Sequence, residues 1–128
     1  MLPQGLTIKT REDMIIWKNT TGNISEEEAL MVSKEIQNLI KGHTYHAMVV
    51  DNRELSGVWT TEVDRVWIEL MTTLPTYVDK TVTICQNVIN KLQLNYLSKQ
   101  AGTTNNIRAF VSTEDLEIKA FLGVEEYY

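Results

Sequence analysis

Cysteine is almost absent from this sequence: Cys85 is the single one, so the chain cannot form an internal disulfide. A reducing compartment such as the cytoplasm is the simplest expectation for such a chain. No apolar run approaches the roughly 20 residues that a membrane-spanning helix needs. The start, from Met1 to Gly5, lacks a basic stretch followed by an apolar core, so we expect no signal peptide.

Prolines are also scarce, with two in the chain, and no linker, low-complexity tract or internal repeat is present. The 128 residues, 43% apolar and 23% charged, therefore predict one globular domain over residues 1–128. The 12 lysines and arginines are spread without a cluster, and the formal net charge is −5. This charge pattern argues against a nucleic acid or an anionic membrane as the partner.

Hydrophobic periodicity predicts strands that alternate with helices. The first two strands, around 5–9 and 14–18, flank a polar turn and form a hairpin. Later strands are expected at 47–50, 81–85 and 107–111, and helices with their caps at 25–42, 60–74, 87–102 and 112–123. The order β-β-α-β-α-β-α-β-α predicts an α/β fold with a mixed, mainly parallel sheet covered by helices.

Several helix ends carry specific signals. Ser25 and Glu28 form the sequence pattern of a capping box, and Gly42 ends that helix. Ser112 or Thr113 is expected to cap the last helix. In the third helix the predicted inward residues are Ile89, Leu92, Tyr96 and Leu97, whereas Leu94 is expected off that face and available for an interface. The final residues, 125–128, are expected to form a solvated tail.

Local patterns in matching order resemble a known family. GNISEEE, from Gly22 to Glu28, resembles a glycine, a polar cap and an acidic first turn. VVDNRELSG, from Val49 to Gly57, resembles a strand that ends in an aspartate and a short loop. QAG at 100–102 and RAFVSTED at 108–115 resemble the closing strand and helix. Together they resemble the SpoIIAA-like branch of the STAS superfamily, the fold of bacterial anti-sigma-factor antagonists.

The resemblance implies a binding protein that acts at the joint between the third strand and the second helix. In the antagonists a serine at the start of that helix is phosphorylated by a partner kinase, and Thr60 and Thr61 fall at this place. The sequence here departs from the Asp-Ser pattern of the family, and nearby acidic residues would repel a phosphate. The alternative is that Thr60 or Thr61 caps the helix.

Asp51, Arg53 and Trp59 complete the candidate partner-binding set at this joint. Asp51 and Arg53 have a catalytic interpretation, as an acid and a substrate clamp, but an aspartate at a strand end more often accepts amides from its own loop. Trp59 lies outside the inward stripe of the second helix, so it either marks a contact surface or folds back onto the core.

We expect no catalytic residues, no metal site and no cofactor. His43 and His46 have no further ligand at suitable spacing. Cys85 has no histidine after it and is interpreted as a small buried apolar side chain. Gly57 stands alone, so no glycine-rich phosphate loop is present.

Two functions follow from these observations. The first is a non-catalytic, cytoplasmic binding or regulatory domain of a bacterium, whose partner is another protein or a second copy in a homodimer. The second is a carrier of a small apolar ligand, because SpoIIAA-like domains resemble the fold of lipid-transfer domains. Its pocket would be lined by five methionine and tryptophan side chains: Met14, Trp17, Met48, Trp67 and Met71.

Overall fold

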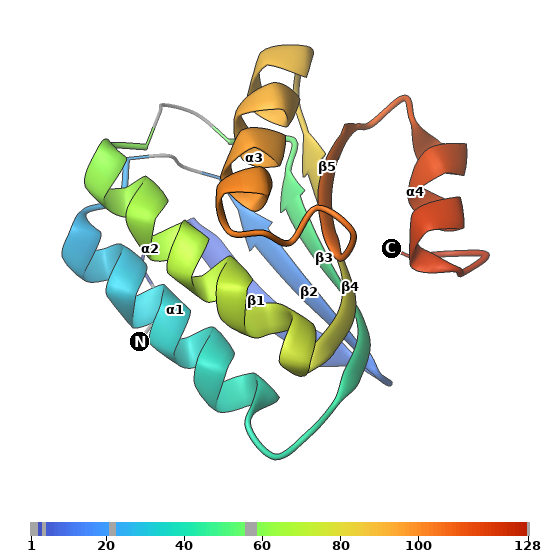
Figure 1. Cartoon of the computed structure of the whole chain (residues 1–128), viewed down its shortest axis with the longest axis horizontal. Helices are drawn as coiled ribbons and strands as arrows, with labels where there is room; N and C mark the ends of the chain where they lie inside the picture. Colours follow the sequence, from blue (N-terminus) through green and yellow to red (C-terminus); the bar gives the residue numbers. More distant parts are fainter. Residues whose placement is uncertain (1–2, 4, 21–22, 56–58, 128) are drawn as a thin grey trace.

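The computed structural model describes residues 3, 5–20, 23–55 and 59–127. Gly22, the part of the joint at 56–58 and Tyr128 lie outside the described residues. The predicted order of elements is confirmed, with a short 3-10 turn, η1, added before β4 (Figure 1). The elements are β1 (Leu6–Arg11), β2 (Met14–Asn19), α1 (Glu26–Ile40), β3 (Tyr45–Asn52), α2 (Thr61–Thr73), η1 (Leu74–Thr76), β4 (Val78–Cys85), α3 (Val88–Gln100), β5 (Ile107–Val111) and α4 (Asp115–Leu122).

The sheet is mixed and has the strand order β1-β2-β3-β4-β5. β1 pairs with β2 antiparallel, and the other three pairings are parallel. The hairpin therefore supplies the antiparallel edge, as predicted. Because β2 to β5 run in one direction, their carboxyl ends meet at one edge of the sheet, where binding sites of α/β folds usually lie.

Two apolar cores lie on the two faces of the sheet. On one face α1, α2 and α3 pack over the strands, and Figure 1 shows them side by side in front of the sheet. On the other face α4 covers the sheet through Ile118 and Leu122. Alternate residues of a strand point to opposite faces, so Met48 and Val50 join the first core whereas Val49 joins the second.

The helix caps explain where several helices begin. Ser25 Oγ accepts from the Glu28 amide and Glu28 Oε1 accepts from the Ser25 amide, each at 3.0 Å, so the predicted capping box is confirmed. The predicted cap of α4 is wrong, because this helix begins after Glu114 without a side-chain cap. The Glu114 carboxylate instead accepts from the Val111 amide and from Lys91 Nζ.

The predicted inward face of α3 is also wrong. Ile89, Leu92 and Tyr96 are 68%, 61% and 60% exposed, whereas Leu94 is buried together with Leu97. The reason is that α3 lies along the outer edge of β5 and presents polar side chains to it.

Polar contacts from α3 satisfy that edge of β5. Asn95 Oδ1 accepts from the Ala109 amide at 2.8 Å, and Asn95 Nδ2 donates to the Ala109 carbonyl at 3.1 Å. Ser98 Oγ donates to the Ile107 carbonyl at 2.7 Å. An edge strand has unpaired backbone groups that need partners. Because Asn95 and Ser98 pair with these backbone groups, their side chains face β5. The apolar side chains of Ile89, Leu92 and Tyr96 are therefore left on the exposed side of α3.

Candidate binding site at the carboxyl edge of the sheet

A short chain of hydrogen bonds joins the carboxyl ends of β2 and β3. Trp17 Nε1 donates to Asn19 Oδ1 at 2.7 Å, and Asn19 Nδ2 donates to Asn52 Oδ1 at 2.8 Å. All three side chains are buried on the face covered by α1, α2 and α3. An indole nitrogen can only donate, so the orientation of both amides follows from Trp17. The chain therefore ends in a donor, Asn52 Nδ2.

Trp17, the first member of this hydrogen-bonded chain, also belongs to a row of three tryptophan rings with Trp67 in the middle. The ring of Trp67 meets the ring of Trp17 edge-on with centroids 5.6 Å apart, and it meets Trp59 in the same way at 5.5 Å. Trp59 is half-buried and packs against the first core. Of its two predicted roles, the structure supports the one in which Trp59 folds back onto the core. Its other side borders the clefts at this edge, so a role in contact stays a prediction.

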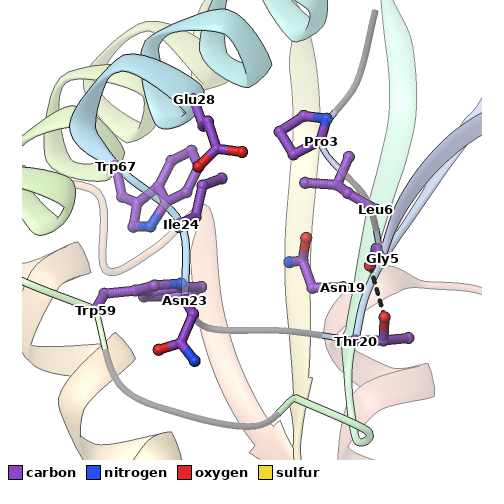
Figure 2. Close-up of a pocket in the computed structure, with 10 residues that line it drawn as sticks. All are labelled: Pro3, Gly5, Leu6, Asn19, Thr20, Asn23, Ile24, Glu28, Trp59 and Trp67. Carbon is purple, nitrogen blue, oxygen red and sulfur yellow. Dashed lines mark hydrogen bonds between the residues drawn. The ribbon is translucent and has the colours of Figure 1, made fainter.

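Trp59 borders two open clefts. The first, of about 430 Å³, lies between the start of α1 and the ends of the β1–β2 hairpin. Figure 2 shows Trp59 and Trp67 on one side of this cleft, with Asn19 and Leu6 on the other. The second, named here the α2–α3 cleft, has a volume of about 460 Å³, and its described lining is Asn52, Leu55, Trp59, Asp64, Asn90, Leu92, Gln93, Leu94, Tyr96 and Leu97.

A third, smaller space of about 40 Å³, named here the internal cavity, is lined by Trp59 and otherwise by buried side chains. Four of the five predicted pocket residues line it, namely Trp17, Met48, Trp67 and Met71. Met14 does not, because its side chain belongs to the second core on the opposite face of the sheet. The error for Met14 has a simple cause: it lies an odd number of positions from Trp17 in the same strand, so the two side chains point to opposite faces.

The sheet also divides the predicted partner-binding set. Asp51 accepts from the Arg53 amide at 3.0 Å and from both Nε and Nη2 of the Arg53 guanidinium, at 3.0 and 2.9 Å. This is the Asx-type turn that the sequence favoured, with an ion pair added. Arg53 lines a cleft on the α4 side together with Asp115 and Tyr127. Asp51 and Arg53 therefore lie apart from Trp59.

Thr60 and Thr61 lie at the start of α2, and both are exposed. Thr60 is the N-cap residue, and its Oγ1 accepts from the Val63 amide at 3.3 Å. The capping role is thus confirmed for Thr60. Phosphorylation of either threonine stays a prediction. Asp64, one turn later, lines the α2–α3 cleft, and partial burial raises its pKa.

The two histidines and Cys85 make contacts within the fold. His46 Nε2 lies 2.8 Å from the Leu122 carbonyl and links β3 to α4, while the ring of His43 packs on Tyr45. Cys85 is buried, as predicted, and burial raises the pKa of its thiol to about 12. Within the described ranges, no three His, Cys, Asp or Glu side chains converge as metal ligands would.

Two features of this edge were missed at the sequence level. The first is the hydrogen-bonded chain through Asn19 and Asn52, and its signal was available: each asparagine lies two positions after the last apolar residue of a strand, Trp17 or Val50, and so on the same face of the sheet as that residue. The second is the exposed apolar stripe of α3, which sequence periodicity placed in the core. Among the helices that the structure describes, none is long and apolar enough to cross a bilayer.

Comparison with known proteins supports the fold. No protein-family model matches the chain, and no curated protein sequence does. Among solved structures, the chain is similar to an uncharacterized protein of the DUF3478 family from Shewanella loihica PV-4, described as having a SpoIIAA-like fold. The two share 11% sequence identity, with a TM-score of 0.62 over 91% of each chain. The chain therefore has the SpoIIAA-like α/β fold that the sequence patterns implied.

Proposed function

We propose that this protein is a non-catalytic, cytoplasmic binding domain that contacts another protein, or a second copy of itself, through the outer face of α3 and the adjoining α2–α3 cleft. The observation that carries the proposal is the exposed apolar stripe of Ile89, Leu92 and Tyr96. Spaced three and four residues apart, these side chains share one face of the helix.

The stripe differs from ordinary scattered apolar exposure. Seven large apolar side chains are exposed in the described part of the chain, and four of them belong to α3: Val88, Ile89, Leu92 and Tyr96. Single exposed apolar residues need no explanation, whereas a contiguous group often marks a contact surface. The same helix carries only two charges, Lys91 and Lys99, and Lys91 is paired with Glu114 at 2.7 Å. A partner would therefore desolvate little charge on binding α3.

The predicted joint contributes part of this surface. Trp59 lines the α2–α3 cleft together with Leu92 and Tyr96, so this residue of the joint lies beside the stripe. Arg53 and Asp51 lie on the α4 side of the sheet and are not included. The proposed surface is thus centred on α3, with Trp59 at its inner border, and it lies at the carboxyl edge where α/β folds commonly bind partners.

The experiment compares wild type with Ile89→Glu and with a matched control, Leu116→Glu. Leu116 is 78% exposed on α4, on the other side of the sheet, so its substitution adds the same charge at a distant apolar site. Sedimentation velocity measures self-association, and affinity capture from the native cytoplasm measures binding to other proteins. We expect Ile89→Glu to abolish the interaction and Leu116→Glu to preserve it.

Both variants should unfold at the wild-type temperature, because surface substitutions away from structural contacts usually change stability by within about 0.5 kcal/mol. A monomeric wild type that captures no protein would overturn the proposal. So would an interaction that Leu116→Glu weakens as much as Ile89→Glu, because it would then not depend on α3.

A further inference from the structure

Three buried polar atoms belong to residues that line the internal cavity. They are Asn52 Nδ2, Trp67 Nε1 and Thr81 Oγ1, and none of them has a hydrogen-bond partner among the described residues. Their residues are 1%, 5% and 2% exposed, and all three line the cavity. Buried polar groups are rarely left unpaired, because each costs about 1–3 kcal/mol. Three such atoms in one cavity therefore point to an occupant.

The chemistry of the three atoms defines what the occupant must offer. Asn52 Oδ1 is already used by Asn19, so the free group of Asn52 is its amide donor. The Trp67 indole is a donor only, and the Thr81 hydroxyl can donate or accept. The occupant must therefore supply a hydrogen-bond acceptor. No charged side chain belongs to the described lining of the cavity, so a carboxylate or an ammonium group would be buried without a counter-charge, which is costly.

The remaining lining is mostly apolar, with Asn19 and Thr83 as further polar residues, and it borders the α2–α3 cleft. Met48, Leu70 and Met71 line the cavity beside the polar atoms. Asn52, Trp59 and Leu94 line both the cavity and the cleft, so these side chains form the boundary between the two spaces. The cavity alone has room for about three water molecules, but the cleft, at about 460 Å³, is in the size range of small-molecule sites.

We propose that the protein binds an uncharged amphipathic molecule, with a hydroxyl or carbonyl head in the internal cavity and an apolar body in the α2–α3 cleft. The head accepts hydrogen bonds from Asn52 and Trp67 and exchanges one with Thr81. The body packs against Trp59, Leu92 and Leu94. Asp64, the acid in the described lining of the cleft, disfavours an anionic body. The ligand body and the proposed protein contact share the α2–α3 cleft and Leu92, whereas the head site in the cavity is used by the ligand alone.

Tryptophan fluorescence offers a direct test, because all three tryptophans of the chain line the cavity. The full-length protein is titrated with decanol, with decane and with decanoate. Decanol should give a saturable change in fluorescence. Decane, which has no acceptor, and decanoate, which is charged, should bind at least about fivefold more weakly, the effect of one neutral hydrogen bond.

A conservative variant tests the polar head. Thr81→Val keeps the shape of the side chain but removes the hydroxyl, so decanol affinity should fall about fivefold while decane affinity is unchanged. The thermal unfolding temperature of the apo variant should equal or exceed that of wild type, because an unpaired buried group is removed. Thr7→Val, at an exposed position of β1, serves as the matched control.

Three results would overturn the proposal. One is the absence of saturable decanol binding. Another is equal affinity for decane and decanol with no effect of Thr81→Val. The third is a crystal structure grown with decanol in which ordered water alone occupies the cavity. Loss of protein contact in Ile89→Glu would not bear on this site, because Ile89 does not belong to the described lining of the cavity or the cleft.

Discussion

Asn19 Nδ2 donates a hydrogen bond of 2.8 Å to Asn52 Oδ1, across the carboxyl ends of β2 and β3. Replacing Asn19 with alanine would leave both the Trp17 indole donor and the Asn52 acceptor unpaired in the core. We expect Asn19→Ala to lower the free energy of unfolding by about 2–4 kcal/mol, since each buried unpaired group costs roughly 1–3 kcal/mol. Urea denaturation measures this change.

A second asparagine provides the control for that substitution. Asn105 is exposed, so Asn105→Ala should change the free energy of unfolding by less than about 0.5 kcal/mol. If Asn19→Ala were equally mild, the buried chain from Trp17 to Asn52 would not contribute to the stability of the sheet edge.

The reactivity of Cys85 tests the burial of the β4 end. Its side chain is inaccessible, and burial raises the pKa of the thiol to about 12, with Lys91 acting in the opposite direction. A thiolate is the reactive form of cysteine, so an aromatic disulfide reagent should label Cys85 in the native protein no faster than the protein unfolds. Labelling should be complete in guanidinium. Rapid labelling of the native protein would contradict the placement of Cys85.

Much of the fold could be predicted because the local signals of the sequence agreed with one another. The capping box at Ser25 and Glu28, the apolar run of β3 and the glycine at position 123 each specify a local conformation, and tertiary packing preserved all of them. Strands that alternate with helices then leave few topologies. The order of the elements along the chain, the mainly parallel sheet and the antiparallel first pair followed from these signals.

The orientation of α3 could not be predicted in this way. Periodicity assumes that the apolar face of a helix turns inward, but the edge of β5 required polar partners, which Asn95 and Ser98 supply. The side of the sheet that a side chain occupies follows from strand alternation, which places Asp51 and Asn52 on opposite sides at the end of β3. The predicted site did not use this alternation and so combined Arg53 with Trp59, although the sheet separates them.

Alkaline pH tests the contact between the end of the chain and α4. The predicted solvated tail is wrong at Tyr127, which packs against the second core and donates a hydrogen bond of 2.6 Å to Asp115. Partial burial, followed by this hydrogen bond, raises the pKa of Tyr127 to about 12. Since an unfolded tyrosine has a pKa of about 10, the phenol stabilises the fold fully below about pH 10, and this contribution is lost as the pH rises towards 12.

Tyr127→Phe isolates that effect from other groups that titrate at high pH, including Cys85. The difference in unfolding free energy between wild type and variant should shrink as the pH rises from about 10 to 12. The phenolate absorbance of native wild type should include a component that appears at higher pH and is missing from the titration of the native variant. A constant difference in stability across this range would show that Tyr127 is solvated.

The start of α2 allows a separation of the capping role of Thr60 from a role in phosphorylation. Thr60→Ala removes the acceptor of the Val63 amide and should lower the free energy of unfolding by about 1 kcal/mol, while Thr60→Ser, which keeps the hydroxyl, should change it little. Thr61→Ala, one residue later and exposed, is the matched control and should change the free energy of unfolding by less than about 0.5 kcal/mol.

Mass spectrometry of the protein from its native cells tests whether Thr60 is phosphorylated. A phosphate on Thr60 would have to replace the cap beside Glu62 and Asp64, so we expect Thr60 to be unmodified, and a stoichiometric phosphate there would contradict the capping role as its sole function.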